Sequence, residues 1–524
     1  MHRIASRRLA PIPRAAALLL AALFVAAPLA AQSIARRVEA VLKRPEFAHA
    51  MAGVEFYDLA AGKAVYRLNG DKFFVPGSTT KLLTVGTALE LLGPDYRFHT
   101  RIYRTGPIAA DGTLDGDLVL VASGDPNLSG RIRPDGTLAF KDEDHSYSGD
   151  AVEGDPLLVI RELAGQVAQK GIKRVRGSVL VDASLFQAGD REGGTGVVIS
   201  PIVVNDNVID VVLTPAAAPG AAATFTVSPL TSYLRLTVNV ATGAAGSPDQ
   251  VNFTANVPAP DRTHDVTLTG SVPAGGKPQL VPWRVPDPAR FAEIVLAEAL
   301  HERGIVAAAP PANAAPDLKA LAASYTDPNQ VAEHVSPPLA AAAKVVLKVS
   351  QNLHASTLPR VVGAVLAKKP EPQAGFDQEH EFLARAGLDL GSAAQGDGAG
   401  AVAHFTPDFM VGYLAYMAKQ KSFTAFYDGL PILGRDGTLF NIQVSSPAAG
   451  QVRGKTGTYA QDDLLNQSTM VTGKGLAGYF TRPDGRRFAF AVYLNNVDVK
   501  GNDAIRKIVG EAVGEIAAAG YLGR

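Results

Sequence analysis

A serine and a lysine three positions apart, Ser78 and Lys81, have the side chains needed for acyl transfer. The apolar spacing that follows predicts a helix opening near Ser78 and stopped by Gly93-Pro94. Residues three apart lie on one helix face, so the amine could take the hydroxyl proton. Burial and the helix N-terminus both disfavour the ammonium form, and backbone amides there could stabilise an oxyanion. The competing interpretation of Ser78 is an ordinary helix cap.

The motif Ser350-Gln351-Asn352 provides a second hydroxyl and a side-chain amide. It lies between two predicted helices, 339–349 and 352–366. A tight connection between the helices would point Ser350 and Asn352 the same way. The hydroxyl could relay a proton to a leaving amine, and the amide could hold a substrate carbonyl or the lysine. The competing interpretation is that Ser350 caps the helix that begins near Asn352.

A glycine-flanked lysine lies on a predicted strand, 451–458. Glycine in a strand often marks the close approach of a ligand or another backbone. An edge strand could pair with an extended peptide while its lysine and hydroxyls bind the terminal carboxylate. The competing interpretation is a surface strand with a solvated lysine. The residues concerned are Gly454, Lys455, Thr456, Gly457 and Thr458.

Several other kinds of site are excluded by spacing or composition. Gly450 stands one residue too close to Gly454-Lys455-Thr456 for a Walker phosphate loop, and no Gly-x-Ser-x-Gly elbow surrounds Ser78. The chain has no cysteine and no His-Glu-x-x-His motif, so we expect no disulfide and no metal. The 50 basic and 50 acidic side chains balance, so we expect no nucleic-acid partner.

The N-terminal 1–31 has the pattern of a cleaved secretory signal peptide. Basic residues precede an apolar run at 15–31 that is short for a membrane span and contains Pro28. No later segment approaches transmembrane length, so we expect an exported protein without a membrane anchor. The basic residues are Arg3, Arg7, Arg8 and Arg14.

Strand-like segments at both ends of the chain, with helical segments between them, predict one α/β domain whose termini share a sheet. We expect this domain to be discontinuous, formed by 33–102 and 283–524. The region 103–282 consists mostly of strand-like pieces broken by Gly, Pro and Asp, which predicts an inserted β region of two nested subdomains. The terminal strands are expected at 54–59, 63–68, 475–480 and 487–494.

In this order, the three motifs resemble the signature of penicillin-binding proteins and serine β-lactamases. The long interval between Ser78 and Ser350 is similar to that of the low-molecular-mass class C D-alanyl-D-alanine carboxypeptidases and endopeptidases. Further blocks similar to that family follow at 74–84, 123–128, 177–186, 204–207, 336–339, 430–431 and 436–439.

The resemblance implies an α/β (α+β) penicillin-binding or β-lactamase-like transpeptidase domain, with an antiparallel sheet beside a helical region. It implies a serine-type D-Ala-D-Ala carboxypeptidase or endopeptidase that acts on peptidoglycan peptides in the periplasm. β-Lactams would acylate the same serine and inhibit it covalently. No metal or organic cofactor is implied.

The resemblance also implies residue roles. Ser78 would be the acylated nucleophile and Lys81 its base, with Ser350 and Asn352 as proton relay and positioning groups. The backbone amides of Ser78 and Thr458 would form the oxyanion hole. The substrate-binding residues, with the lysine and two hydroxyls as a carboxylate clamp, would be Lys455, Thr456, Gly457 and Thr458.

Three departures from the family pattern bear on substrate preference. Asp397-Gly398-Ala399-Gly400 lacks the serine usual at the third position, and Ser356 stands where an acidic residue is usual. The segment 459–475 is also longer than the usual link to the next strand.

Two rival functions stay open at this point. One is a β-lactamase or a D-amino-acid esterase or amidase on the same scaffold. The other is a non-catalytic wall-binding protein.

Overall fold

The computed structural model describes residues 33–141, 143–147, 150–311 and 316–523. The predicted signal peptide, 1–31, lies outside these residues. None of the helices in the described ranges combines the length and the apolar character needed to cross a bilayer.

One antiparallel sheet joins the two ends of the chain. Its order is β17-β18-β19-β1-β2, and β20 pairs with β18 beside this path. β1 pairs with β19 along its whole length, which confirms that the chain ends share a sheet. β17, which carries the glycine-flanked lysine, lies at one edge of the sheet. The strands are β1 (Met51–Asp58), β2 (Lys63–Leu68), β17 (Val452–Asp463), β18 (Ser468–Thr481), β19 (Arg487–Asn495) and β20 (Val497–Val499).

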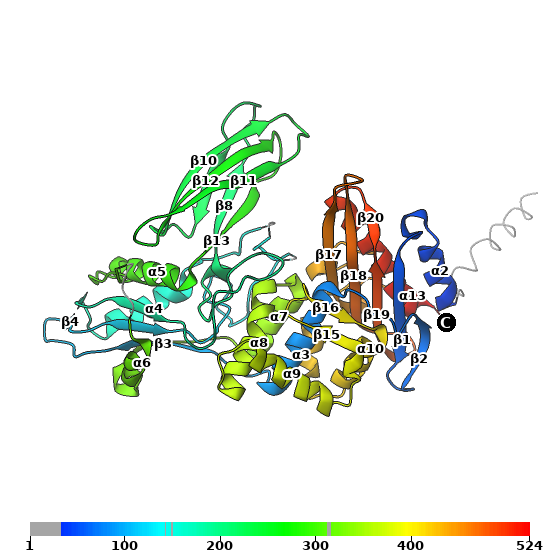
Figure 1. Cartoon of the computed structure of the whole chain (residues 1–524), viewed down its shortest axis with the longest axis horizontal. Helices are drawn as coiled ribbons and strands as arrows, with labels where there is room; N and C mark the ends of the chain where they lie inside the picture. Colours follow the sequence, from blue (N-terminus) through cyan, green and yellow to red (C-terminus); the bar gives the residue numbers. More distant parts are fainter. Residues whose placement is uncertain (1–32, 142, 148–149, 312–315, 524) are drawn as a thin grey trace, which may run out of the picture.

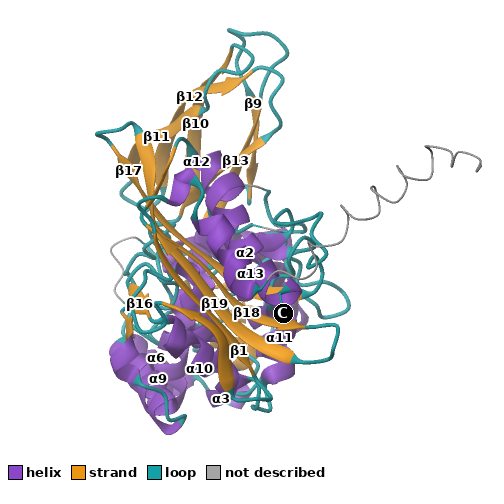
Figure 2. Ribbon diagram, turned by 90° about the vertical axis from the view of Figure 1, so that its right-hand side faces the viewer, coloured by secondary structure: helices purple, strands orange, loops and turns teal. Residues whose placement is uncertain are grey.

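Helices cover both faces of this sheet (Figure 2). One face packs against α2 (Ile34–Leu42), α13 (Glu511–Leu522) and the π-helical turn Ile505–Gly510 that follows α12 (Asn502–Ala504). The helical region on the other face comprises η3 (Gly77–Thr80), α3 (Lys81–Leu91), α7 (Leu339–Val349), α8 (Asn352–Val362), α9 (Gln373–Arg385), α10 (Pro407–Met417) and α11 (Phe423–Gly429). A short ribbon of β15 (Ala393–Gln395) and β16 (Ala403–Phe405) lies with it.

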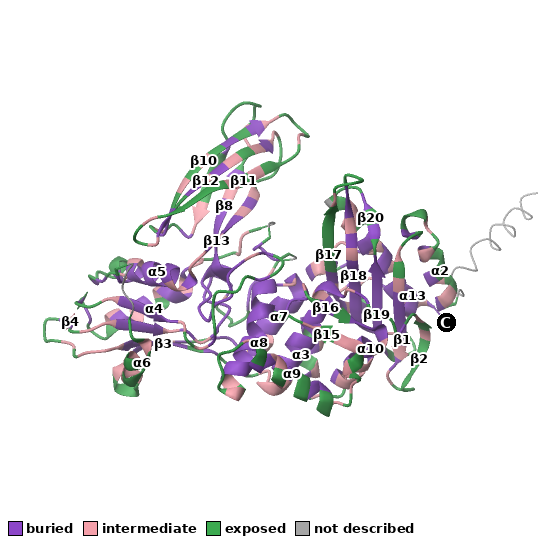
Figure 3. Cartoon of the chain, in the orientation of Figure 1, coloured by how far each residue is buried: buried purple, intermediate pink, exposed green. Residues whose placement is uncertain are grey.

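The central strand β19 shows why both faces are covered. Phe490 and Val492 belong to the apolar cluster beneath α2 and α13, whereas Ala491 and Tyr493 belong to the cluster beneath α3 and α10. Successive side chains of a strand point to opposite faces, so a strand that is apolar throughout must be buried on both. Figure 3 shows this burial along the sheet.

The inserted region forms two further lobes beside the helical region (Figure 1). The first is a sheet in the order β14-β3-β5-β7 with α4 and α5 packed on it. Its elements are β3 (His99–Arg104), β5 (Leu118–Val121), α4 (Leu158–Gln169), β7 (Val179–Asp182), α5 (Pro288–Glu302) and β14 (Gln330–Val335). A two-stranded ribbon of β4 (Thr113–Leu114) and β6 (Arg174–Val175), and the short α6 (Leu318–Leu321), lie at its margin.

The second lobe is a pair of small sheets that projects away from the rest (Figure 1). One sheet has the order β13-β8-β9 and the other β10-β12-β11. Their inner faces share a separate small apolar cluster, typical of a β-sandwich. The strands are β8 (Val208–Thr214), β9 (Thr224–Ser228), β10 (Leu234–Gly243), β11 (Gln250–Pro258), β12 (His264–Pro273) and β13 (Gln279–Arg284).

Pairing and packing contacts favour wider limits for the insertion than the expected 103–282. β3 and β14 pair with each other, and α5 contributes Phe291 and Leu296 to the apolar cluster of the first lobe. These packing contacts place 99–335 with the insertion. We therefore propose that the discontinuous domain resumes near residue 336 instead of 283.

Candidate active site

Ser78 and Lys81 lie where the 3₁₀ turn η3 passes into α3, and their reactive atoms are in contact. Lys81 Nζ is 2.6 Å from Ser78 Oγ. Neither η3 nor α3, both wholly described, is capped by a side chain. Ser78 is therefore not a helix cap, and its hydroxyl faces the amine.

The second motif meets the same amine. Ser350 has a left-handed backbone, with φ of 64°, between α7 and α8. Its Oγ lies 3.3 Å from Lys81 Nζ, and Asn352 Oδ1 lies 2.5 Å from it. The cap of α8 is Gln351, which accepts from the His354 backbone N–H at 3.0 Å. The capping interpretation of Ser350 is therefore wrong.

The third motif completes a continuous polar chain. Lys455 Nζ donates to Ser350 Oγ at 2.8 Å and to the Thr456 carbonyl at 2.8 Å. Lys455 is fully buried, so the interpretation as a solvated surface lysine is wrong. The chain of contacts runs Ser78, Lys81, Ser350, Lys455, and it joins three segments far apart in sequence.

Gly457 allows β17 to reach the nucleophile. A Cβ at this position would lie 2.0 Å from the Pro76 carbonyl oxygen and 3.0 Å from the Ser78 backbone nitrogen. Both atoms are backbone and cannot move aside cheaply, so a side chain here would push the strand away from Ser78. The structure thus places Gly457 at the close backbone approach that its position in a strand suggested.

Burial shifts these lysines toward the neutral amine. Desolvation lowers the pKa of Lys81 to about 8, although the carboxylates of Glu192, Asp144 and Asp397 oppose the shift. The pKa of Lys455 falls well below its ordinary value through desolvation and through repulsion from Lys81 and a further lysine. Lys81 can therefore hold a lone pair near neutral pH, which a general base for a hydroxyl requires.

The departure at Asp397–Gly400 leaves the support of Lys81 intact. The Ala399 carbonyl oxygen lies 3.3 Å from Lys81 Nζ. Asp397 accepts hydrogen bonds from the backbone of Ala399, at 2.7 Å, and of Gly400. This local turn fixes the carbonyl, so the contact comes from backbone and needs no side chain at residue 399.

The insertion contributes two groups that sequence reasoning missed. Asp144 Oδ2 accepts from the Asn352 backbone N–H at 3.1 Å, and the Tyr147 hydroxyl contacts Asn352 Nδ2. Both residues stand in a charged loop segment with no periodic pattern, so only the tertiary contact reveals them. The inserted lobe therefore forms one wall of the site.

Behind this wall lies a fully buried charge network. Asp206 accepts from Arg131 at 2.6 Å and contacts His354 at 2.7 Å and His145 at 3.0 Å. Burial opposes ionisation, but the Arg131 guanidinium and the two histidine rings hold the pKa of Asp206 well below its usual range. The network ties the insertion to α8 directly beneath the second motif.

Oxygens of Asp144 and Asp206 and a ring nitrogen of His145 lie within 4.8 Å of one another, close enough for metal ligands. Asp206, however, already faces the Arg131 guanidinium and the ring of His354. Positive charge at those distances repels a metal cation, so the residues fit an ion-pair network better than a metal site.

Two more side chains join the cleft from neighbouring segments, again without a motif of their own. Thr438 Oγ1 lies 2.7 Å from Thr456 Oγ1. Lys474 Nζ, on β18, donates to Thr458 Oγ1 at 2.7 Å. The segment 436–439 was singled out by resemblance, but nothing in the sequence pointed to Lys474.

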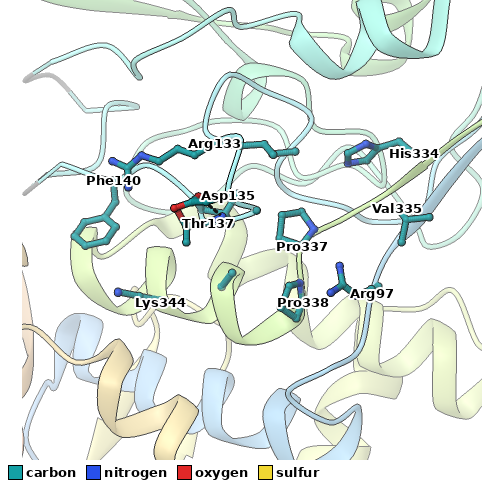
Figure 4. Close-up of a pocket in the computed structure, with 14 residues that line it drawn as sticks. Arg97, Arg133, Asp135, Thr137, Phe140, His334, Val335, Pro337, Pro338 and Lys344 are labelled. Carbon is teal, nitrogen blue, oxygen red and sulfur yellow. Dashed lines mark hydrogen bonds between the residues drawn. The ribbon is translucent and has the colours of Figure 1, made fainter. Parts of the chain in front are cut away.

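Ser78, Ser350 and Thr458 open onto one cleft of about 850 Å³. A second hollow, of about 740 Å³, lies between the loop 132–140 and the N-terminal end of α7 (Figure 4). Its hydroxyl, Thr137, donates to the exposed Asp135 at 2.7 Å, and no lysine of the described residues is hydrogen-bonded to it. Among the described residues, a hydroxyl paired with a buried lysine amine is thus found in the first cleft and not in the second.

The site combines a hydroxyl beside a buried amine with a second hydroxyl that bridges two lysines, and an edge strand lies beside them. This arrangement defines a serine acyl-enzyme hydrolase with a penicillin-binding fold. A family model described as the D-Ala-D-Ala carboxypeptidase 3 (S13) family matches residues 34–514. The chain belongs to this family and is a serine-type carboxypeptidase.

Similar proteins agree with this assignment. The chain is 28% identical to a D-alanyl-D-alanine carboxypeptidase of Actinomadura sp. (strain R39), with 87% of this chain and 80% of that protein covered. It is 25% identical to the D-alanyl-D-alanine carboxypeptidase DacB of Haemophilus influenzae, covering 82% and 81%. The crystal structure of penicillin binding protein 4 (dacB) from Haemophilus influenzae superposes with a TM-score of 0.70 at 21% identity, covering 92% and 97%, which shows the same fold.

Proposed function

We propose that this enzyme hydrolyses the peptide bond after a D-alanine in peptidoglycan peptides, either D-Ala-D-Ala or D-Ala-diaminopimelate, through an acyl-Ser78 intermediate. The observation that carries the proposal is the 2.6 Å contact between Lys81 Nζ and Ser78 Oγ in a buried site. Family membership supports the substrate class.

In the acylation step the Lys81 amine takes the Ser78 hydroxyl proton as Oγ attacks the carbonyl carbon of the D-alanine. The carbonyl π electrons move to oxygen and give a tetrahedral oxyanion. The backbone amides of Ser78 and Thr458 would hold that oxyanion. The close approach of the two backbones supports this role, because a Cβ on Gly77 would lie 2.6 Å from the Thr458 backbone nitrogen.

Departure of the amine needs a proton, which Ser350 would supply. Its Oγ lies 3.3 Å from Lys81 Nζ and 2.8 Å from Lys455 Nζ. The proton taken from Ser78 passes through the Ser350 hydroxyl to the leaving nitrogen as the carbon–nitrogen bond breaks. Asn352 holds Lys81 in position throughout.

The edge strand would align the substrate. The backbone of β17 can pair with an extended peptide, while Lys455 and the hydroxyls of Thr456 and Thr458 bind its terminal carboxylate. A water molecule then attacks the acyl carbon by the reverse proton route and releases Ser78. A β-lactam ring acylates the same serine, but its leaving group stays tethered and the adduct hydrolyses slowly.

The proposed location is the periplasm, where cross-linked peptidoglycan peptides are found. The signal-peptide pattern at 1–31 supports export. A structure of penicillin binding protein 4 (dacB) from Haemophilus influenzae complexed with a novel β-lactam superposes with a TM-score of 0.67. It supports acylation of this chain by the same class of compound.

Fluorescent penicillin applied to the purified mature protein tests the nucleophile. We expect a stable covalent label that disappears in Ser78→Ala. No label in the wild type, or a label that survives this substitution, would contradict the proposal. Rapid turnover of the penicillin without a stable adduct would instead favour a β-lactamase.

Cross-linked muropeptides and free pentapeptide, assayed side by side, separate endopeptidase from carboxypeptidase activity. Both reactions use Ser78 and differ only in the group beyond the scissile bond. Retention on peptidoglycan with no cleavage of either substrate would favour a wall-binding role.

A further inference from the structure

Lys474 is a third buried lysine of the active-site region, and its place on β18 brings it beside the edge strand. It stands opposite Thr458 in the β17–β18 register. Directly opposed residues of an antiparallel pair present their side chains on the same face. Lys474 Nζ accordingly donates to Thr458 Oγ1 at 2.7 Å, and both residues line the cleft that holds Ser78.

The backbone around Lys474 is held against the segment that carries the nucleophile. A Cβ on the neighbouring Gly475 would lie 2.8 Å from the Pro76 carbonyl oxygen and 2.9 Å from the Thr79 side chain. The strand therefore touches the turn on either side of Ser78. The position of Lys474 relative to Ser78 is set by backbone packing and does not depend on a mobile loop.

Lys474 is buried, yet no carboxylate of the described residues forms an ion pair with it. Desolvation lowers its pKa to about 8, and no acidic neighbour opposes the shift. Buried charges in folded proteins are normally paired or neutralised. A buried amine that faces a cleft without an anionic partner is therefore a site that an anion from outside can complete.

The hydrogen bond to Thr458 also determines what that hydroxyl can do. A hydroxyl has one proton to donate and two lone pairs to accept with. Because the Lys474 amine donates to Thr458 Oγ1, the hydroxyl proton must point elsewhere, and the cleft is the open direction. Lys474 thus prepares Thr458 as a donor toward an anion.

We propose that Lys474 and Thr458 form an anion-binding pair that takes the terminal carboxylate of the substrate and makes the enzyme selective for peptides with a free carboxylate. This inference rests on the proposed function and adds a specificity residue to it. Lys455, which precedes Thr456 on β17, supplies the first cation for the carboxylate. Lys474 on β18 supplies a second. The carboxylate then neutralises a group of lysines that otherwise repel one another.

The test compares one peptide ending in D-Ala-D-Ala as the free acid with the same peptide as its C-terminal amide. The variants are Lys474→Met, which keeps the side-chain length without charge, and Lys474→Arg, which keeps the charge. Hydrogen bonds to charged groups contribute about 1.5–3 kcal/mol, so Lys474→Met should lower kcat/KM for the acid by about 10- to 100-fold. The amide should change by less than about 3-fold, and Lys474→Arg should retain most of the activity on the acid.

Three controls separate a loss of carboxylate binding from a general loss of activity. Lys43→Met, at the exposed residue that follows α2, should not change kcat/KM for either substrate. Fluorescent penicillin and its carboxyl ester provide a second acid and neutral pair whose readout is acylation alone. In a Thr458→Val background, the Lys474→Met effect on the acid should shrink, because the two residues act as a unit.

Equal losses on acid and amide, or no loss on either, would overturn the proposal and indicate a structural role for Lys474. If Lys474→Met does not fold, a wild-type-like preference for the acid in Thr458→Val would overturn it. Failure of the proposed function is separate, since it appears as absence of wild-type acylation by penicillin.

Discussion

Two buried groups of charge lie on either side of the Ser350–Asn352 turn, and they are built in opposite ways. On the cleft side, Lys81, Lys455 and Lys474 form no ion pair among the described residues, and desolvation lowers the pKa of each. On the far side, Asp206 pairs with the Arg131 guanidinium and contacts the ring of His354. The three lysines, called here the unbalanced group, are available for chemistry and for binding. The network around Asp206, called here the balanced group, holds chain segments together.

The balanced group explains how an inserted lobe can control a catalytic turn. Arg131 and Asp206 belong to the insertion and His354 to α8, so the network crosses the boundary between the two parts. Gln351 adds a hydrogen bond to Asp206 at 3.1 Å from within the second motif itself. The turn that carries Ser350 is therefore fixed from behind by residues absent from any catalytic motif.

The largest effect on activity is expected from Lys81→Met, which removes the base from the unbalanced group. General-base catalysis contributes about 10²- to 10⁴-fold, so acylation by fluorescent penicillin should slow by about 10³-fold with the melting temperature preserved. The exposed Lys344→Met on α7 is the matched control and should acylate normally. A loss below about 10-fold would mean that another group takes the Ser78 proton.

The largest effect on stability is expected from Asp206→Ala, which breaks the balanced group. It leaves Arg131 buried without its partner, and removal of one member of a buried pair costs about 3–5 kcal/mol in the free energy of unfolding. Urea unfolding measures the loss, with the exposed Asp377→Ala as control. A loss under about 1 kcal/mol would show that the network is not what ties the lobes together.

A smaller effect on acylation is expected from Tyr147→Phe, because Tyr147 belongs to the insertion and reaches Lys81 only through Asn352. The hydroxyl contacts Asn352, which in turn contacts Lys81. Loss of one hydrogen bond of about 0.5–1.5 kcal/mol should slow acylation by about 3- to 10-fold without changing the melting temperature. Unchanged acylation would restrict the insertion to a structural role.

The smallest effect on acylation is expected from Glu55→Gln. This substitution tests whether a buried acidic group outside the cleft affects catalysis. Desolvation and the neighbouring Asp408 raise the pKa of Glu55 to about 8, far from the cleft. The folded protein therefore keeps a proton that the unfolded chain releases above its ordinary pKa of 4.5, and stability falls as pH rises from about 4.5 to 8. Glu55→Gln should flatten this slope in urea unfolding at several pH values and leave acylation unchanged. A large change in acylation would show that a buried charge outside the cleft also affects catalysis.

Local patterns predicted the segments of the site well and their surroundings poorly. The helix after Ser78, the connection at Ser350 and the glycine-flanked strand each follow from short-range spacing, and the shared terminal sheet follows from strands at both ends. Asp144, Tyr147 and Lys474 reach the cleft through tertiary packing alone, so no periodicity marks them. The apolar face of α5 does not say which lobe the helix covers, so the sequence alone leaves the limits of the insertion open.

The pairing of β1 with β19 has a consequence for biogenesis. In sequence, β1 lies far ahead of its partner β19. Until β19 pairs with it, the hairpin of β1 and β2 has an unsatisfied edge, a state that favours association with other chains. Ser78 and Lys81 likewise lie far ahead of Lys455, so a variant truncated before β17 would lack the third motif, be catalytically silent and be prone to aggregation. Activity is thereby conferred only on molecules in which the distant strands have paired.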